Sequence, residues 1–140
     1  MGLDGKDKGL KGIRWRIFME TKCFFDLWDW NEAESLADEI YLITFKFPIE
    51  EKYGLISQLR SAAVSVFSNI AEGSGRGSFK DYVRFLINAR GSIQEVLAQL
   101  HFSKKRKYIS NEEYEKLFCR YNRLAAAINN HIKSLRSEKD

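Results

Sequence analysis

The sequence has few of the residues that break helices or cross-link chains. It contains one proline, Pro48, and two cysteines, Cys23 and Cys119, among 140 residues. The cysteines form no CxxC or Cys/His spacing, so the sequence predicts neither a disulfide framework nor a zinc site. No apolar run approaches the length of about twenty residues that a membrane span needs, and no stretch alternates like a half-buried strand. These absences predict an all-α protein of the cytoplasm, without a membrane segment.

Groups that perform covalent or metal chemistry are also few. The only histidines, His101 and His131, have no cysteine or serine partner at a motif spacing. The Glu-x-x-His pairs of a di-iron bundle do not occur. The glycine-rich stretch 73–77 and Lys80 do not match the phosphate-loop pattern, so we expect an interhelix turn there. We therefore predict no catalytic residue, no metal and no cofactor, and leave open a contact of Arg76 or Lys80 with an RNA phosphate.

The net charge of +4 is unevenly distributed along the chain. Residues 1–22 carry six basic and three acidic residues, residues 23–76 carry four and nine, and residues 77–140 carry thirteen and seven. This division favours complementary contacts between subunits or an anionic partner at one end. Residues 1–22 are predicted to be a disordered basic extension, or translation from a start upstream of the natural one at Met19. A basic RNA-binding arm is the alternative.

Four stretches repeat apolar residues at steps of three and four, the spacing that lines one face of a helix. Short loops between four helices predict an antiparallel up-down-up-down four-helix bundle over residues 23–140. Within it, Ser78 is expected to be an N-cap, Ser110 and Glu113 a capping box, and Gly73 a left-handed residue that ends the second helix. The expected helices end near Lys46, run from Glu50 or Tyr53 to Glu72, run from Ser78 to about Lys107, and run from Ser110 to about Leu135.

Three runs of residues in order carry a family resemblance: EKYGLISQLRSAAVS at 51–65, SNIAEG at 68–73 and FLINARGS at 85–92. They resemble the four-helix-bundle proteins encoded in intervening sequences of bacterial 23S ribosomal RNA genes. The accessory proteins of diversity-generating retroelements look like a branch of that family. The resemblance runs from about Phe25 to Leu117. It implies the bundle fold and a homopentamer and, in the retroelement branch, binding to nucleic acid and a reverse transcriptase.

Two positions depart from the family pattern. Phe67 stands where the family usually has a proline, so we expect a continuous helix where the proline would kink it. Lys107 stands where the family usually has a glycine, which predicts a cost of about 1 kcal/mol if the backbone there is left-handed.

The resemblance also singles out six polar residues on the second and third helices. One interpretation is a patch that recognises a ligand or a protein. The favoured interpretation is a structural polar network that fixes helix register or joins subunits, because half-buried charges must be paired. The six residues are Asn69, Glu72, Arg76, Arg90, Ser92 and Glu95.

A run of cations near the end of the third helix is the best binding candidate. Lysine and arginine neutralise phosphates, and the neighbouring aromatic groups can stack on unpaired bases. A solvated helix end, whose cations offset the helix dipole, explains the same residues. We expect a non-catalytic homo-oligomer that binds structured RNA or DNA; the alternative is a protein-interaction adaptor, such as an accessory subunit for a reverse transcriptase. The predicted nucleic-acid-binding residues are Lys104, Lys105, Arg106, Lys107, Arg120 and Arg123.

Overall fold

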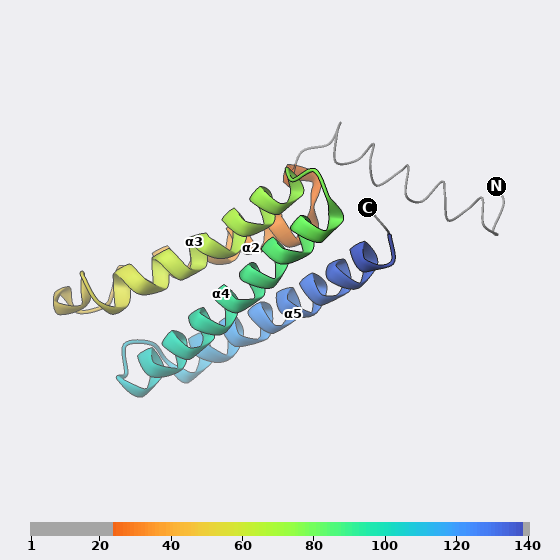
Figure 1. Cartoon of the computed structure of the whole chain (residues 1–140). Helices are drawn as coiled ribbons and strands as arrows, with labels where there is room; N and C mark the ends of the chain where they lie inside the picture. Colours follow the sequence, from red (N-terminus) through yellow and green to blue (C-terminus); the bar gives the residue numbers. More distant parts are fainter. Residues whose placement is uncertain (1–23, 139–140) are drawn as a thin grey trace.

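The computed structural model describes residues 24–138, and its regular elements over that range are all helices (Figure 1). The predicted extension, residues 1–22, lies outside the described residues. None of the helices described is long and apolar enough to cross a membrane. The elements are η1 (Phe24–Asp26), α2 (Trp28–Thr44), η2 (Ile49–Glu51), α3 (Leu55–Ser74), α4 (Phe79–Lys105) and α5 (Asn111–Arg136).

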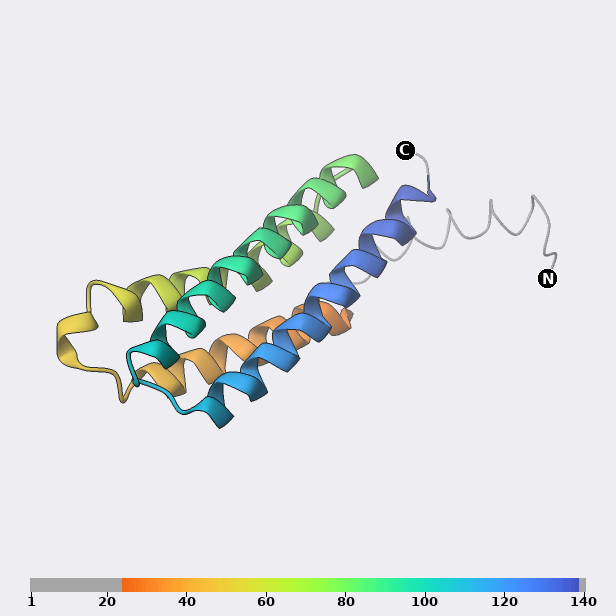
Figure 2. The ribbon, with the colours of Figure 1, turned by 90° about the horizontal axis from the view of Figure 1, so that it is seen from below.

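Contacts between neighbouring helices show that the bundle is antiparallel. Early in α3, Gln58 meets Gln99 late in α4, whereas Ser65 further along α3 meets Ser92 earlier in α4. The same reversed order joins α2 to α5, where Asp29 meets His131 and Lys46 meets Glu113. Figures 1 and 2 show the four helices running alternately up and down the long axis. The predicted all-α, up-down-up-down four-helix bundle is therefore confirmed.

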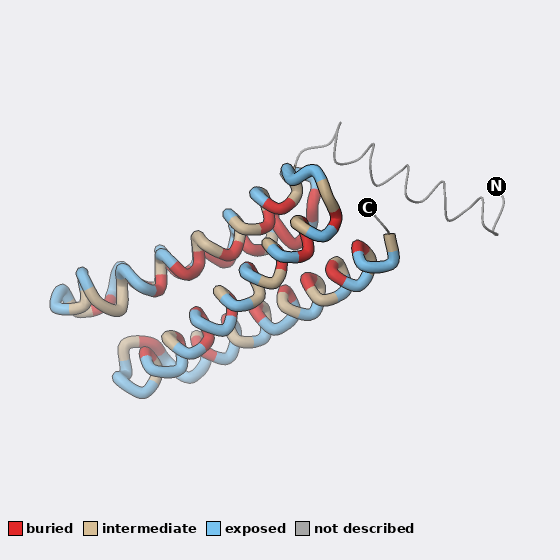
Figure 3. The backbone as a smooth tube through the Cα atoms, viewed as in Figure 1, coloured by how far each residue is buried: buried red, intermediate tan, exposed pale blue. Residues whose placement is uncertain are grey.

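The core lies along the inner faces that the apolar spacing predicts. Figure 3 shows buried positions recurring along the inner side of each helix. The residues that recur at steps of three and four in α4 are all fully buried: Tyr82, Leu86, Ala89, Ile93, Val96 and Leu100. In α3 the spaced residues are Ile56, Leu59, Ala63, Val66 and Ile70, of which only Ile56 remains partly exposed. Leu36 of α2 joins this core although it is not one of the spaced residues there, which are Trp30, Ala33, Ala37, Ile40, Thr44 and Phe47. The largest fully buried side chains are Tyr82, Tyr121, Leu36, Ile40, Leu59, Ile70, Leu86, Ile93, Leu100, Leu124, Ile128 and Leu135.

Local sequence signals set the starts of α4 and α5. The Ser78 hydroxyl accepts a hydrogen bond from the Asp81 backbone N–H at 3.1 Å. Ser110 and Glu113 form the complete capping box, with hydrogen bonds of 3.0 and 2.9 Å between side chain and backbone in each direction. These bonds satisfy N–H groups that have no partner within the helix. The predicted caps are thus confirmed.

The prediction for Gly73 is wrong. No described glycine has a positive φ, and α3 continues to Ser74 with Gly75 as a right-handed C-cap at φ −91°. Gly73 is needed because α4 passes close by. A Cβ at Gly73 would lie only 2.8 Å from the Cβ of Phe85 and 3.1 Å from Cδ1 of Tyr82. The helix pair α3 and α4 therefore requires a residue without a side chain at this position.

Phe67 behaves as the sequence predicts. The helix α3 runs unbroken through it from Leu55 to Ser74. The ring packs edge-on against Trp30 of α2, with centroids 6.1 Å apart. The large apolar side chain thus strengthens the α2 and α3 contact at the end of the bundle where the described chain begins.

Candidate nucleic-acid interface

The turn between α4 and α5 displays four consecutive cations at one end of the bundle. The Arg106 N–H donates to the Phe102 carbonyl, and the Lys107 N–H donates to the Lys104 carbonyl, each at 2.9 Å. Lys107 then adopts φ 66°, the left-handed conformation in which the sequence analysis expects a cost for replacing the family's glycine. The chain reverses direction between Lys105, the last residue of α4, and Asn111, the first residue of α5. We call residues Lys104, Lys105, Arg106 and Lys107 the basic turn.

The basic turn is open to solvent. Lys105, Arg106 and Lys107 are exposed, and Lys104 is half-buried with its ammonium 4.3 Å from the Tyr114 ring centroid. Ion pairs between the described residues use other cations, so none of these four charges has a carboxylate partner there. A hydrogen bond with Tyr108 raises the pKa of Arg106, which keeps its charge at any physiological pH. The turn can therefore contact phosphates without first breaking an ion pair.

Tyr108 anchors the basic turn to the loop that follows α2. Its ring lies 5.2 Å from that of Phe47, and its hydroxyl donates to Glu51 at 3.0 Å. Tyr108 is half-buried, and its ring packs within the fold. Phe102, which precedes the basic turn, is by contrast 49% exposed.

Arg120 and Arg123 lie apart from the basic turn. Arg120 donates to both carboxylate oxygens of Glu32, at 3.0 and 3.2 Å, and to Ser35 at 3.3 Å. The hydrogen bond with Glu32 raises the pKa of Arg120. Arg123 is exposed, one turn further along α5. The structure therefore does not bring these two arginines together with the basic turn, and it places Arg120 in a bridge between α5 and α2.

The six polar residues of the predicted network fall into separate contacts. Ser92 shares a 2.9 Å hydrogen bond with Ser65 of α3, and Asn69 donates to the same Ser65. Glu72 at the end of α3 pairs with Arg76 of the following turn at 2.8 Å. Arg90 bridges α4 to Asn129 of α5 at 2.8 Å, and Glu95 accepts from Gln99 within α4 at 3.3 Å. Two of these contacts join helices, but they do not form one connected network.

The structure also contains a buried ionisable pair that the sequence analysis missed. His131 Nδ1 lies 2.7 Å from Asp29, and both side chains are more than nine-tenths buried. The ring of Tyr82 packs edge-on against His131 at 5.0 Å. Burial, and secondarily the Asp29 charge, raise the pKa of Tyr82, so the phenol stays neutral. His131 lies three residues after Ile128, on the apolar face of α5, which was the available signal of its burial.

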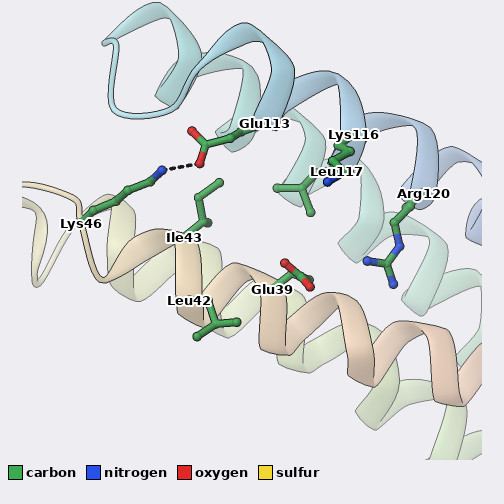
Figure 4. A pocket seen from close by; sticks show the side chains of 8 residues that line it. All are labelled: Glu39, Leu42, Ile43, Lys46, Glu113, Lys116, Leu117 and Arg120. Atoms are coloured by element: carbon green, nitrogen blue, oxygen red, sulfur yellow. Dashed lines mark hydrogen bonds and ion pairs between the residues drawn. The ribbon is translucent and has the colours of Figure 1, made fainter.

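A groove of about 370 Å³ lies between α2 and α5. Figure 4 shows Ile43 and Leu117 pointing into the space between the helices, and the Lys46 and Glu113 ion pair bridging them. The hydrogen bond with Lys46 lowers the pKa of Glu113. Across the described residues, no group of three or more histidine, cysteine or carboxylate side chains could hold a metal ion. The remaining lining residues are Glu39, Leu42, Lys116 and Arg120.

These features define an all-α bundle protein with a basic turn at one end. Residues 26–130 match the family model of the 23S rRNA-intervening sequence proteins, and the chain belongs to that family. It is similar in structure to a protein of unknown function from the S23 ribosomal protein family of Bacteroides thetaiotaomicron, with a TM-score of 0.69 and 21% identity. The match covers 75% of this chain and 98% of that one, and it shows the fold. No curated protein matches the chain.

Proposed function

We propose that the protein is a non-catalytic, cytoplasmic nucleic-acid-binding protein whose basic turn contacts structured RNA. The basic turn carries the proposal: four consecutive cations at a tight reversal, without carboxylate partners among the described residues. Such a cluster binds phosphates by releasing counterions. Four phosphate contacts correspond to a slope of log K against log salt of about −3.

We also propose that the protein assembles from identical subunits, as a pentamer by its family resemblance. Exposed apolar side chains support a subunit contact, because Trp28 of α2 is 53% exposed and Ile49 of η2 is 74% exposed. A cyclic assembly would repeat the basic turn on one side of a ring and raise the local density of positive charge. The mass of the purified protein in solution tests the assembly.

The binding test is fluorescence anisotropy of a labelled structured RNA over a series of salt concentrations. The test variant is Lys105→Gln/Arg106→Gln/Lys107→Gln, which spares Lys104 because that side chain packs on Tyr114. The control is Lys116→Gln/Lys133→Gln/Arg136→Gln, which removes the same charge from exposed positions of α5.

We expect saturable binding by the wild type, with an affinity that falls steeply with salt. The basic-turn variant should weaken binding and flatten the slope by about 2 to 3, while the α5 control stays close to the wild type. Equal effects of the two variants would mean that the basic turn has no special role. No binding at low salt would reject the nucleic-acid proposal.

The second candidate is a protein-interaction adaptor, such as an accessory subunit for a reverse transcriptase. The groove between α2 and α5 favours it, because an apolar floor surrounded by charges of both signs suits a protein surface. Glu39→Lys/Leu42→Asp would then abolish binding of a purified reverse transcriptase encoded beside the gene and leave RNA affinity unchanged. If the reverse transcriptase binds this variant as tightly as the wild type, the groove is excluded as its binding site.

A further inference from the structure

A stacked arrangement of one arginine and two aromatic rings lies on the outer face of α2 and α3. The guanidinium carbon of Arg60 is 4.6 Å from the ring centroid of Tyr41 and 5.0 Å from that of Phe45. Arg60 Nε donates to Thr44 Oγ1 at 2.9 Å, and Nη2 donates to the Tyr41 carbonyl at 3.3 Å. We call Tyr41, Phe45 and Arg60 the aromatic platform. Its arginine is held in place by neutral acceptors, and not by an ion pair.

The platform offers an exposed ring and N–H donors that make no hydrogen bond within the described fold. Phe45 is 74% exposed, so much of its ring is open to solvent. A guanidinium has five N–H donors, and the two hydrogen bonds to α2 leave the others available beside the ring. Arg60 also makes no ion pair with a carboxylate in the described part of the chain. An exposed ring can stack on the base of a nucleotide, and the neighbouring arginine can bond the phosphate or the edge of the base.

The platform is continuous with the basic turn. Phe45 is the C-cap of α2, and Phe47, two residues further, packs against Tyr108, which directly follows Lys107. Figure 1 shows the end of α2 and the turn between α4 and α5 at the same end of the bundle. In the other direction, the groove next to Tyr41 is lined by Glu34 and Asp38. These carboxylates disfavour a polyanion on the side of the platform that faces away from the basic turn.

We propose that the aromatic platform binds unpaired nucleotides of the RNA, with a base stacked on Phe45 and the adjoining phosphate or base edge bonded to Arg60. This inference rests on the proposed function, because the same RNA continues onto the basic turn. In a duplex the bases are stacked on one another and their faces are not accessible. The platform thus selects single-stranded segments or loops, and the basic turn contributes contacts that do not depend on base identity.

The experiment compares two labelled probes of equal length, a single-stranded uridine oligonucleotide of about ten residues and an RNA duplex of about ten base pairs. Both are titrated against the full-length wild type, Phe45→Leu and Arg60→Gln. Phe45→Leu removes the ring and keeps an apolar side chain. The control is Phe25→Leu, because Phe25 is 59% exposed at the opposite end of the bundle. Helicity and assembly mass are measured for every variant.

We expect tighter binding of the single strand by the wild type and a loss of about 5- to 100-fold in that affinity for Phe45→Leu, since one base is stacked per ring. Duplex binding and the Phe25→Leu control should change little. An unchanged single-strand affinity for Phe45→Leu would overturn the inference and leave the basic turn as the RNA site. No binding of either probe by the wild type would reject the proposed function itself. A change of assembly mass in Phe45→Leu would assign the ring to a subunit contact and also overturn the inference.

Discussion

Replacing Gly73 by alanine tests whether α3 and α4 pack as closely as the structure shows. The added Cβ would lie 2.8 Å from Phe85 Cβ, 3.1 Å from Tyr82 Cδ1 and 3.3 Å from the Tyr82 carbonyl oxygen. Phe85 Cβ is fixed to the backbone and cannot rotate away, so the two helices must separate. Overpacking of this kind costs about 1 to 3 kcal/mol. Alanine recovers at most about 1 kcal/mol through helix propensity, and less near a helix end. We expect a net loss of roughly 1 to 2 kcal/mol in the free energy of unfolding.

Gly91 provides a matched control for this substitution. It is exposed in the middle of α4, and beyond its chain neighbours and the helix's own backbone no atom lies within 4 Å of its added Cβ. Gly91→Ala should therefore stabilise the protein by about 0.5 to 1 kcal/mol. Urea unfolding followed by circular dichroism, at one fixed protein concentration because assembly contributes to stability, should shift the midpoints in opposite directions. A Gly73→Ala midpoint as high as that of Gly91→Ala would refute the close approach.

Three further predictions concern stability. Lys107→Gly should raise the free energy of unfolding by up to about 1 kcal/mol, because φ 66° is strained for lysine. An unchanged unfolding midpoint would argue against the left-handed backbone. Asp29→Asn should cost about 1 to 3 kcal/mol, since it weakens the 2.7 Å buried contact with His131, and thermal melting at neutral pH checks this. The pKa of Glu113 is lowered by Lys46 from its ordinary value of 4.5, so this pair stabilises the fold above that pH and loses its effect as the pH falls through the folded pKa. Glu113→Gln should therefore remove less than about 1 kcal/mol at pH 7, because the pair is partly exposed, and its difference from the wild type should shrink as the pH falls through the folded pKa; a difference that does not shrink with falling pH would contradict the assignment.

The local parts of the fold could be predicted from the sequence. The apolar spacing identified the buried face of each helix, because that spacing depends only on residues three and four apart. The caps at Ser78 and Ser110 were predictable for the same reason, because each depends on a few consecutive residues. The basic turn was found in this way, since its four cations are adjacent in the chain.

Contacts between helices could not be predicted, because they depend on how each helix is rotated and aligned with its neighbour. Gly73 was assigned to a helix end, since glycine is common there, but its absent side chain is required by α4. The position of His131 on an apolar face indicated burial but did not identify Asp29, 102 residues away in the chain, as its partner. The position of Arg60 over Tyr41 and Phe45 likewise follows only from the packing of α3 on α2.

The division of charge along the chain has a different meaning once the helices are placed. The acidic α2 and the basic α5 are neighbours, so part of their complementarity is satisfied within one chain by Arg120 with Glu32. Lys46, just after α2, pairs in the opposite sense with Glu113 of α5. Those pairs do not require a partner molecule. The consecutive cations of the basic turn remain without carboxylate partners among residues 24–138. An anionic partner is therefore expected at the end of the bundle where α4 finishes. Neutralising the basic turn should reduce RNA affinity more than removing the same charge from α5.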